Sequence, residues 1–505
     1  MAGPETTRGW VERRAPGAGT LRLSVSGPGA APYHLVTVAA GRHAFLGSVF
    51  AAFDAAAIQV WTEADVTAAT FDRGCTGGIT TAIATCDGRP VGIVWSDFRV
   101  NGAAYGRATS SRLTAFLRHL RAHGDDVPLI YVVNSAGVSI MEGRTAFSTA
   151  FGIWPELLRY AESHLVLTCA VGKCLGLAPL LYGLGHYRVA VAQRTQLNLT
   201  GPDVMRMFFG RDAADFESRA SAERCVERHD LVHEIVPSTE VAFALFRALL
   251  ARQPAPPSWT RDPDIGPRTR ALLGHFLDHP PRELVPGWCP RVRLFIGTRR
   301  GRAVGIFVNP LERADNLIRV RTLDKYAAGL DLFRALRLPI LSVLDSPGID
   351  PRFDQGDSGC VRRILSVGQK IIDYPYGAMA VVAGRCYGGA TTLAFPKVFG
   401  GRRAIAVRGA QIGVMDDRIV GHILSASARL LAQWRGTVAA RGPGFEDLLA
   451  EGSLDAVIDP VDLPGEVDRF LDECGERPGR PLRLVPRAEL GVATTRTGDR
   501  LEVVR

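Results

Sequence analysis

Short apolar runs alternate along the chain with stretches whose apolar residues recur at helical spacing. Each run is bounded by Gly, Pro or Asp, which predicts a buried strand between turns. Strands that alternate with helices predict an α/β fold of stacked β-α units. The expected strands are Pro90–Val94, Leu129–Val133, Ile340–Leu344 and Met379–Ala383, and the expected helices are Ser110–His123 and Thr322–Leu336.

One long-period repeat runs through this pattern. The offset between corresponding residues is 213 (301 − 88), 211 (346 − 135) and 212 (384 − 172) in three matching places. Three matches at a nearly constant offset predict two copies of one fold. The paired segments are Gly88–Val94 with Gly301–Phe307, Asn134–Gly137 with Asp345–Gly348, and Gly172–Ala178 with Gly384–Ala390.

A proline-rich stretch separates the two copies and predicts a stiff linker. Its prolines are Pro254, Pro256, Pro257, Pro263 and Pro267. At 505 residues the chain is also too long for one ordinary core. We predict an N-terminal extension with helices over residues 1–69, a first domain over 70–252, the linker over 253–268, a second domain over 269–475 and a C-terminal tail over 476–505.

Composition narrows the class of protein. Hydrophobic residues make up 47% and charged residues 22%, as in globular proteins. The net charge of +9 comes from scattered arginines without a basic run interleaved with aromatics, so a nucleic-acid partner is not expected. No apolar stretch suits a signal peptide or a membrane span, which predicts a cytoplasmic protein.

Metal-binding and disulfide patterns are weak in this sequence. Nine cysteines form no C-x-x-C pair, so neither a zinc ribbon nor a disulfide framework is expected. Two histidine pairs, His119 with His123 and His229 with His233, have helical spacing but no Cys or Glu cluster beside them. We predict no metal site.

The repeated turns carry the candidate chemistry. A strand that ends in Asp345-Ser346-Pro347-Gly348 must turn sharply, and the segments that begin at Gly172 and Gly384 place small residues before a helix. Unpaired N–H groups at such a junction form an anion pocket that can stabilise an enolate oxygen. The alternative is that these glycines serve only close packing of helix on strand.

In order and spacing, these segments resemble the carboxyltransferase subunits of biotin-dependent acyl-CoA carboxylases. The resemblance covers roughly residues 70–460. In the first half it rests on Gly88–Val91, Asp97–Val100, Ser135–Gly137, Glu142-Gly143, Gly172–Ala178 and Gly201–Val204. In the second half it rests on Gly287-Trp288, Gly301–Ile306, Val308–Pro310, Asp324–Ala327, Pro339-Ile340, Asp345–Gly348, Lys370 and Tyr387–Ala390.

The resemblance implies tandem crotonase-like (ClpP/crotonase) β-β-α superhelix domains. It also implies transfer of a carboxyl group between carboxybiotin and the α-carbon of an acyl thioester. The thioester oxyanion hole falls on the N–H groups of Gly176 and Leu177, and the carboxybiotin contact falls on Gly389 and Ala390. The further substrate-binding residues that it implies are Ser135, Ala136, Gly137, Gly172, Cys174, Gly348, Tyr387, Gly388, Thr391 and Thr392.

Partners follow from the same resemblance. The substrate would be a thioester of coenzyme A or of an acyl-carrier protein. The chain has neither a Met-Lys-Met biotinylation site nor a phosphate-binding loop, so carboxybiotin would come from a biotin carrier protein loaded by a biotin carboxylase. Family active sites lie between two protomers, which implies a homo-oligomer, a hexamer or a dimer.

Several departures from the family pattern leave three functions open. Asn134, Ala136 and Ser139 replace a carboxylate, a glycine and a cation. Leu177 replaces a glycine, Thr391-Thr392 replaces Tyr-Asp, and Asp416 replaces a glycine. The alternatives to carboxyl transfer are a biotin-independent decarboxylase of a malonyl-type thioester in specialised metabolism, and a catalytically silent structural subunit.

Overall fold

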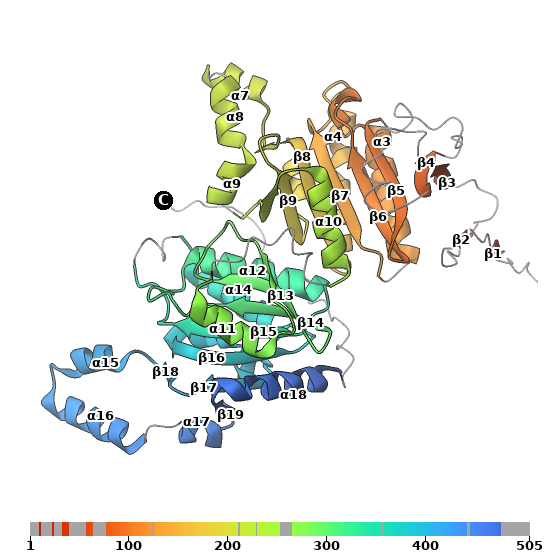
Figure 1. Cartoon of the computed structure of the whole chain (residues 1–505). Helices are drawn as coiled ribbons and strands as arrows, with labels where there is room; N and C mark the ends of the chain where they lie inside the picture. The colour runs from red at the N-terminus through yellow and green to blue at the C-terminus, as the bar shows by residue number, and fades with distance from the viewer. Residues whose placement is uncertain are drawn as a thin grey trace, which may run out of the picture.

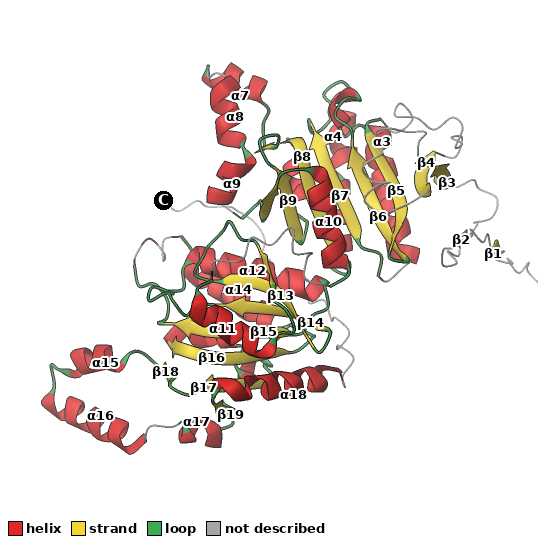
Figure 2. Ribbon diagram, viewed as in Figure 1, coloured by secondary structure: helices red, strands yellow, loops and turns green. Residues whose placement is uncertain are grey.

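In this computed structural model the chain forms two α/β units, each built on one twisted sheet (Figures 1 and 2). The structure describes residues 10–11, 23–24, 33–39, 57–63, 77–123, 126–210, 213–228, 230–252, 265–352, 354, 358–441 and 445–475. No helix within these ranges is long and apolar enough to cross a bilayer.

The first sheet has the strand order β11-β9-β8-β7-β6-β5-β4-β3, with β10 paired to β8. Its strands are β3 Tyr33–Ala39, β4 Ala57–Glu63, β5 Ile79–Cys86, β6 Arg89–Ser96, β7 Leu129–Ser135, β8 Val166–Leu175, β9 Tyr187–Val191, β10 Gln196–Asn198 and β11 Glu234–Val236. The associated helices are η2 Asn101–Ala103, α3 Arg107–His123, α4 Gly143–Phe151, α5 Ile153–Ala161, α6 Ala178–Tyr182, α7 Pro202–Phe209, α8 Ala213–Ala220, α9 Ala222–Arg228 and α10 Thr239–Leu250.

The second sheet has the order β12-β13-β14-β15-β16-β17-β19, with β18 paired to β16. Its strands are β12 Arg282–Leu284, β13 Arg293–Arg299, β14 Arg302–Val308, β15 Ile340–Ser346, β16 Ala378–Tyr387, β17 Arg403–Val407, β18 Gln411–Gly413 and β19 Ala456–Ile458. The helices are α11 Pro267–Phe276, α12 Val320–Ala335, α14 Cys360–Ile372, η4 Gly388–Ala394, η5 Lys397–Phe399, α15 Asp417–Leu424, α16 Ala428–Arg441, α17 Glu446–Ala450, η6 Pro460–Asp462 and α18 Leu463–Gly475. A separate two-residue pair joins β1 Trp10–Val11 to β2 Leu23–Ser24.

The two large sheets share one connectivity, as the repeat predicts. In each, an antiparallel hairpin (β5–β6 or β13–β14) leads into three parallel strands (β7, β8 and β9, or β15, β16 and β17). The pairing of the two central parallel strands shifts register at equivalent places, before Ser135 and before Ser346. The four strands and two helices expected from the sequence all form, with ends that differ by up to a few residues.

The prediction of helices in residues 1–69 is wrong for the longer segments described there. Tyr33–Ala39 and Ala57–Glu63 are strands that pair with each other and continue the first sheet through β5. Both are rich in β-branched and aromatic residues, and Val36, Ile58 and Val60 are buried. The sheet therefore begins before residue 70.

Other predicted boundaries fall partly beyond the described ranges. Residues 253–264 of the linker and the tail 476–505 lie outside them. The end of the predicted linker is helical, because α11 begins at Pro267, where the missing N–H is not needed. The remaining domain limits stay predictions.

Buried polar contacts join the two halves. The hydroxyl of Tyr187 on β9 donates to Glu234 Oε2 (2.6 Å) and accepts from the backbone N–H of Val285 (3.1 Å). Glu234 also accepts from the guanidinium of Arg282 at 3.0 and 3.1 Å. Around this network one apolar cluster contains residues of both halves, including Phe243 of α10. The halves therefore share part of their core.

Lys325 on α12 is a fully buried cation in the second half. Its Nζ donates to the carbonyls of Trp288 (2.6 Å) and Cys289 (3.4 Å), which hold the loop after β12 against the helix. Burial lowers the pKa of Lys325 to about 8, and the charge of Glu283 acts in the opposite direction.

This pKa predicts a pH dependence of stability. An unfolded lysine titrates near pH ~10.4, so between the two pKa values the unfolded chain binds more protons at this residue. The contribution of Lys325 to the free energy of unfolding therefore rises with pH from about 8. In urea titrations, the midpoint of the wild type should rise relative to that of Lys325→Met across this window. Lys370→Met, which removes a half-buried lysine paired with Asp331, is the control. Parallel profiles for wild type and Lys325→Met would contradict the assignment.

Candidate functional site

A buried serine ends the central strand of each half. Ser135 Oγ donates to the carbonyl of Ala103 (2.7 Å) and accepts from the N–H of Gly137 (3.1 Å). Ser346 Oγ donates to the carbonyl of Asn316 (2.8 Å), and the N–H of the following glycine at position 348 donates to it (3.3 Å). Both serine side chains are fully buried, so each hydroxyl holds a turn from inside.

The glycines in these turns are required by their backbone conformation. Gly137 has φ 101° and Gly348 has φ 114°, values that residues with a Cβ rarely adopt. A Cβ at Gly137 would lie 3.0 Å from the carbonyl oxygen of Leu175, and one at Gly348 would lie 3.3 Å from that of Tyr387. Each serine turn therefore packs directly on the backbone at the end of the next strand.

A side-chain amide or carboxylate ties this next strand end to the turn. Asn134 Oδ1 accepts from the N–H of Lys173, and Asp345 Oδ1 accepts from the N–H of Arg385, both at 2.9 Å. Glycines at positions 172 and 384 make room for these side chains, since a Cβ would lie 2.5 Å from Asn134 Oδ1 or 2.6 Å from Asp345 Cγ. The replacement of a carboxylate by Asn134 therefore preserves the backbone contact.

Free N–H groups follow these strand ends. In the first half, the N–H of Gly176 donates to the carbonyl of Asn198 on β10 (3.2 Å). The next two N–H groups, of Leu177 and Ala178 at the start of α6, donate to no carbonyl in the ranges that the structure describes. Of the predicted pair, Gly176 therefore has its N–H bonded to β10, and the two free neighbouring N–H groups are those of Leu177 and Ala178.

In the second half, Gly389 and Ala390 stand at the start of η4, and within the described residues their N–H groups also donate to no carbonyl. At the repeat offset of 212 (384 − 172), they correspond to Leu177 and Ala178. The two halves thus present the same pair of backbone donors. This correspondence could have been found from the sequence, because subtracting the repeat offset of 212 from residue 390 gives Ala178.

The other predicted site residues divide by exposure. Cys174 is fully buried in the first core, where burial raises the pKa of its thiol, so it supports the turn and cannot contact a ligand. Tyr387 is half-buried and its hydroxyl donates to Gln411 (3.2 Å). Thr391 is exposed and its hydroxyl donates to the carbonyl of Gly388 (2.7 Å). Thr392 is half-buried and Ala136 is exposed beside the turns.

Lys173 on β8 and Arg385 on β16 occupy corresponding positions in the two halves but differ in their partners. Arg385 Nε lies 2.7 Å from Asp345 Oδ1, and its other guanidinium nitrogens donate to carbonyls of residues 313 and 314. Lys173 Nζ lies 5.4 Å from the centre of the Phe98 ring and forms no ion pair with the described residues. Asn134 carries no charge to hold it, so the lysine of the first half stays available to an anion.

No three His, Cys, Asp or Glu side chains gather into a metal-binding group among the residues described. In the predicted histidine pair on α3, His119 stacks on Trp61, with ring centres 4.4 Å apart. His233 of the other pair is fully buried, and burial lowers its pKa.

Comparisons with known proteins agree with this geometry. A family model described as the carboxyl transferase domain matches residues 39–451. The propionyl-CoA carboxylase beta chain of Saccharopolyspora erythraea is 25% identical over 452 residues, covering 79% of this chain and 81% of that protein. The methylmalonyl-CoA carboxyltransferase 12S subunit of Propionibacterium freudenreichii subsp. shermanii is 22% identical over 440 residues, covering 80% and 83%.

Among solved structures, transcarboxylase 12S, a hexamer with methylmalonyl-coenzyme A and methylmalonic acid bound, superposes with a TM-score of 0.70 at 20% identity. It covers 81% of this chain and 84% of that one. A single-chain, multi-domain long-chain acyl-CoA carboxylase gives a TM-score of 0.62 at 17% identity, over 78% of this chain and 41% of that one. These likenesses confirm the predicted crotonase-like fold.

The contact of Asn134 with the Lys173 N–H can be tested directly. Asn134→Ala removes the acceptor and should lower the free energy of unfolding by about 1 kcal/mol. The Lys173 amide should also exchange faster in hydrogen–deuterium exchange. Asn134→Asp keeps the acceptor and is the matched control, expected to behave as wild type in exchange. Equal exchange in all three proteins would contradict the role of Asn134.

Proposed function

The chain belongs to the carboxyl transferase domain family, and from this premise we propose that it moves a carboxyl group between carboxybiotin and the α-carbon of an acyl thioester. The matched region spans most of the chain and includes both pairs of free N–H groups. Its relatives are beta subunits and 12S subunits of biotin-dependent carboxylases and transcarboxylases. The proposal rests most of all on one observation: the same pair of unpaired backbone donors occurs once in each half.

Two donors of this kind suit an oxygen that becomes negative during the reaction. Loss of a proton, or of carbon dioxide from an α-carboxylate, leaves an electron pair at the α-carbon of a thioester and places negative charge on the carbonyl oxygen. Donors that are already oriented stabilise this charge, and each contributes about 3 kcal/mol where such donors have been removed elsewhere. We assign the thioester oxygen to the N–H groups of Leu177 and Ala178.

The residues of the second half fit the ureido oxygen of carboxybiotin, which accepts hydrogen bonds. We assign this oxygen to the N–H groups of Gly389 and Ala390. The side chain of Ile349 lies against Gly389 and gives the turn an apolar wall. When bound, carboxybiotin supplies both the carbon dioxide and, after its release, the base, so no His or Glu base is needed in this chain.

Lys173 extends this assignment to the anionic part of the substrate. Lys173 lies near the end of β8, before the first pair of donors, and unlike Arg385 it has no carboxylate partner in the described ranges. We propose that it attracts the phosphates of coenzyme A, the phosphopantetheine phosphate of a carrier protein, or the carboxylate of a malonyl-type thioester. Biotin carrier and biotin carboxylase chains would be the partners that supply carboxybiotin.

A second candidate function is decarboxylation of a malonyl-type thioester without biotin. Loss of carbon dioxide from such a substrate leaves the same enolate and needs no external base. The first turn holds its two donors by contacts within its own half, which favours this alternative. A silent structural subunit is the third candidate, to be separated from the others by the variants below.

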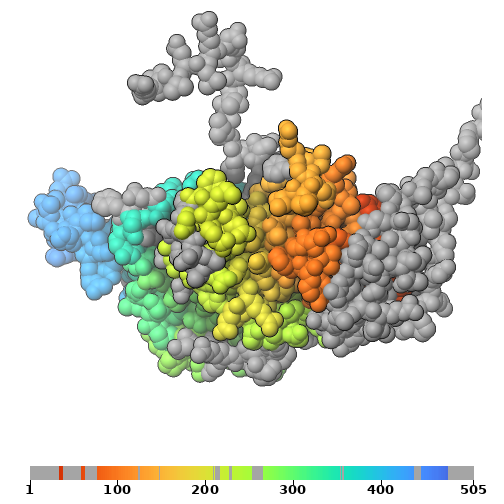
Figure 3. Space-filling model, turned by 90° about the horizontal axis from the view of Figure 1, so that it is seen from above, coloured from red at the N-terminus to blue at the C-terminus, as the bar shows by residue number. Residues whose placement is uncertain are grey.

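We propose that the chain works as a homo-oligomer, dimer or hexamer. Three large apolar side chains on one helix, Val361, Leu365 and Ile372 of α14, are 69%, 68% and 51% exposed. The helices α15 and α16 project from the body, and α15 buries none of its residues (Figure 3). Apolar surfaces of this extent on a single chain are typical of protein interfaces.

Two proline substitutions separate the candidate functions. Leu177→Pro removes one donor of the first pair, and φ −70° at this residue suits proline. Gly389→Pro removes one donor of the second pair. Carboxyl transfer from a carboxylated biotin carrier should fall about 100- to 1,000-fold in both variants, because each loses an oriented donor. Decarboxylation of malonyl- or methylmalonyl-CoA, followed by mass spectrometry, should fall only in Leu177→Pro.

Leu177→Ala and Gly389→Ala are the matched controls, since they change the side chain and keep the N–H. Gly389→Ala shares with Gly389→Pro the contact of a new Cβ with the Ile349 side chain, so the pair differs in the N–H. Circular dichroism checks that all four variants are folded. A wild type that turns over no thioester, with or without the carboxylated carrier, would favour the silent subunit. Equal losses in each proline variant and its alanine control would contradict the role of the N–H groups.

The assembly has its own test. Light scattering of the wild type at micromolar concentration should give the mass of a dimer or larger. Val361→Asp with Leu365→Asp should shift the protein toward smaller species, because two charges on an apolar interface are costly to bury. Val461→Asp, at another exposed valine on η6, is the control. A monomeric wild type, or a double variant of unchanged mass, would contradict the proposal.

A further inference from the structure

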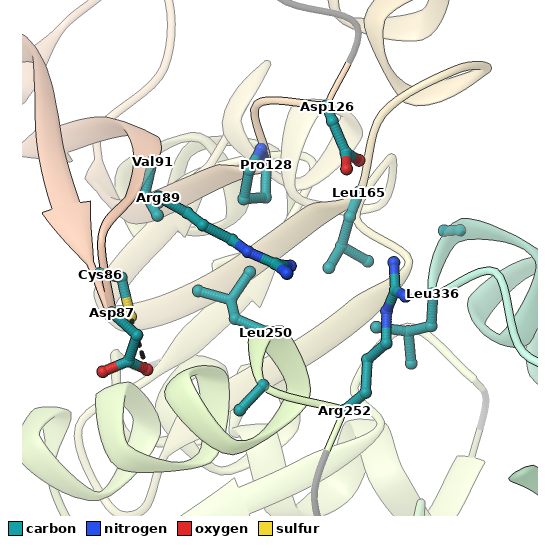
Figure 4. Close-up of a pocket in the computed structure, with 12 residues that line it drawn as sticks. Cys86, Asp87, Arg89, Val91, Asp126, Pro128, Leu165, Leu250, Arg252 and Leu336 are labelled. Carbon is teal, nitrogen blue, oxygen red and sulfur yellow. Dashed lines mark hydrogen bonds between the residues drawn. The ribbon is translucent and has the colours of Figure 1, made fainter. Parts of the chain in front are cut away.

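A cavity of about 470 Å³ lies at the edge of the first sheet opposite to the candidate turns (Figure 4). It is bordered by the starts of β6, β7 and β8, at Arg89, Pro128 and Leu165, whereas the turns follow the ends of β7 and β8. The end of α10 and the end of α12 close it. Since α12 belongs to the second half, the cavity lies at the junction of the two halves.

The charges around this cavity do not cancel. Its two carboxylates have arginine partners: Asp87 lies 3.6 Å from Arg247, and Asp126 lies 3.2 Å from Arg337. Arg89 and Arg252 also line the cavity and form no ion pair with any residue in the described ranges. The lining therefore keeps two unbalanced positive charges. Figure 4 shows both guanidinium groups reaching into the cavity from different elements.

The backbone under Arg252 adds an independent observation. Arg252 follows α10 with φ 54°, and Arg337 follows α12 with φ 56°, a left-handed conformation that is unfavourable for a residue with a Cβ. Glycine adopts it freely and is the usual residue at this position after a helix.

Arg252 is also crowded by like charges. Burial lowers its pKa, Asp126 acts in the opposite direction, and the neighbouring Arg337 and Arg89 lower it further. Arginine remains protonated in this setting, so the repulsion between these guanidinium groups destabilises the folded protein. An anion placed between the guanidinium groups would relieve it.

One wall of the cavity is apolar. Leu165 and Leu250 lie between the arginines, Leu336 lies beside Arg252, and Val91 and Pro128 also line the cavity. A volume of this size is within the range of small-molecule sites, about 300–1,000 Å³. The lining thus combines two unpaired guanidinium groups with an aliphatic surface.

We propose that this cavity binds a small organic dianion, with its charged groups between Arg89 and Arg252 and its aliphatic part against the three leucines. A phosphate monoester and a short dicarboxylate share this chemistry. Both suit the bidentate geometry of arginine. Because one wall comes from the second half, the bound anion joins the two halves, away from both N–H pairs, and stabilises their junction by mass action.

The experiment uses the full chain in its native assembly, with isothermal titration calorimetry and thermal unfolding. Butyl phosphate and glutarate are the two dianion probes, inorganic phosphate lacks the aliphatic part, and butylamine lacks the negative charge. Saturable binding is expected for at least one of the first two in the millimolar range or below. Which of them binds more tightly identifies the source of the dianion. Inorganic phosphate should bind at least tenfold more weakly, and butylamine should not bind.

The variants are Arg89→Gln and Arg252→Gly, with Arg194→Gln, an exposed arginine in the turn after β9, as the charge-matched control. Arg252→Gly removes the guanidinium and relieves the left-handed strain, so it should keep or raise the unfolding temperature while weakening binding at least tenfold. If Arg252 served only the fold, Arg252→Gly would lower the unfolding temperature and leave dianion binding unchanged. Absence of saturable binding by both dianions, equal binding of inorganic phosphate, or undiminished binding in Arg89→Gln and Arg252→Gly alike would overturn the proposal.

Discussion

The hydrogen bonds of one buried serine in each half fix the geometry on which both candidate sites depend. A hydroxyl without access to water must satisfy its donor and its acceptor inside the protein. Ser135 and Ser346 do so by binding a carbonyl from an upstream loop and the N–H of a glycine two residues later. The strand can then turn in only one way. The end of the next strand packs on this turn. The N–H groups that follow this strand end form no hydrogen bond within the sheet.

The two halves keep this frame while their charges diverge. Asp345 forms both a backbone contact and an ion pair with Arg385, whereas Asn134 keeps only the backbone contact with Lys173. The two halves therefore share the hydrogen bond from the backbone N–H to the side chain, but only the second half has the ion pair. This difference distinguishes the proposed roles of the halves, since a paired arginine is part of the scaffold and an unpaired lysine can meet a substrate anion.

The junction between the halves combines a shared core with a charged cavity. Tyr187, Glu234 and Arg282 form a buried hydrogen-bonded network there, and the apolar cluster around it contains residues of both sheets. At the cavity the polar groups are only partly satisfied, because Arg89 and Arg252 lack carboxylate partners among the described residues. The contrast marks the cavity as a place where a ligand can add to the contacts that hold the halves together.

The sequence by itself determined the duplicated α/β fold, the strands and helices around the repeated segments, and the turns that carry the candidate chemistry. Hydrophobic periodicity and runs of small residues are local patterns that predict strands, helices and turns. The constant repeat offset then shows which elements of the two halves correspond. Only the tertiary structure decided which N–H groups are free, because the carbonyl of Asn198 on β10, 22 residues downstream (198 − 176), accepts the N–H of Gly176. It also showed that Cys174 faces the core, that residues before 70 continue the sheet, and that Arg89, Arg252 and Leu336 meet at one cavity. These are contacts between segments far apart in the chain, and no local pattern records them.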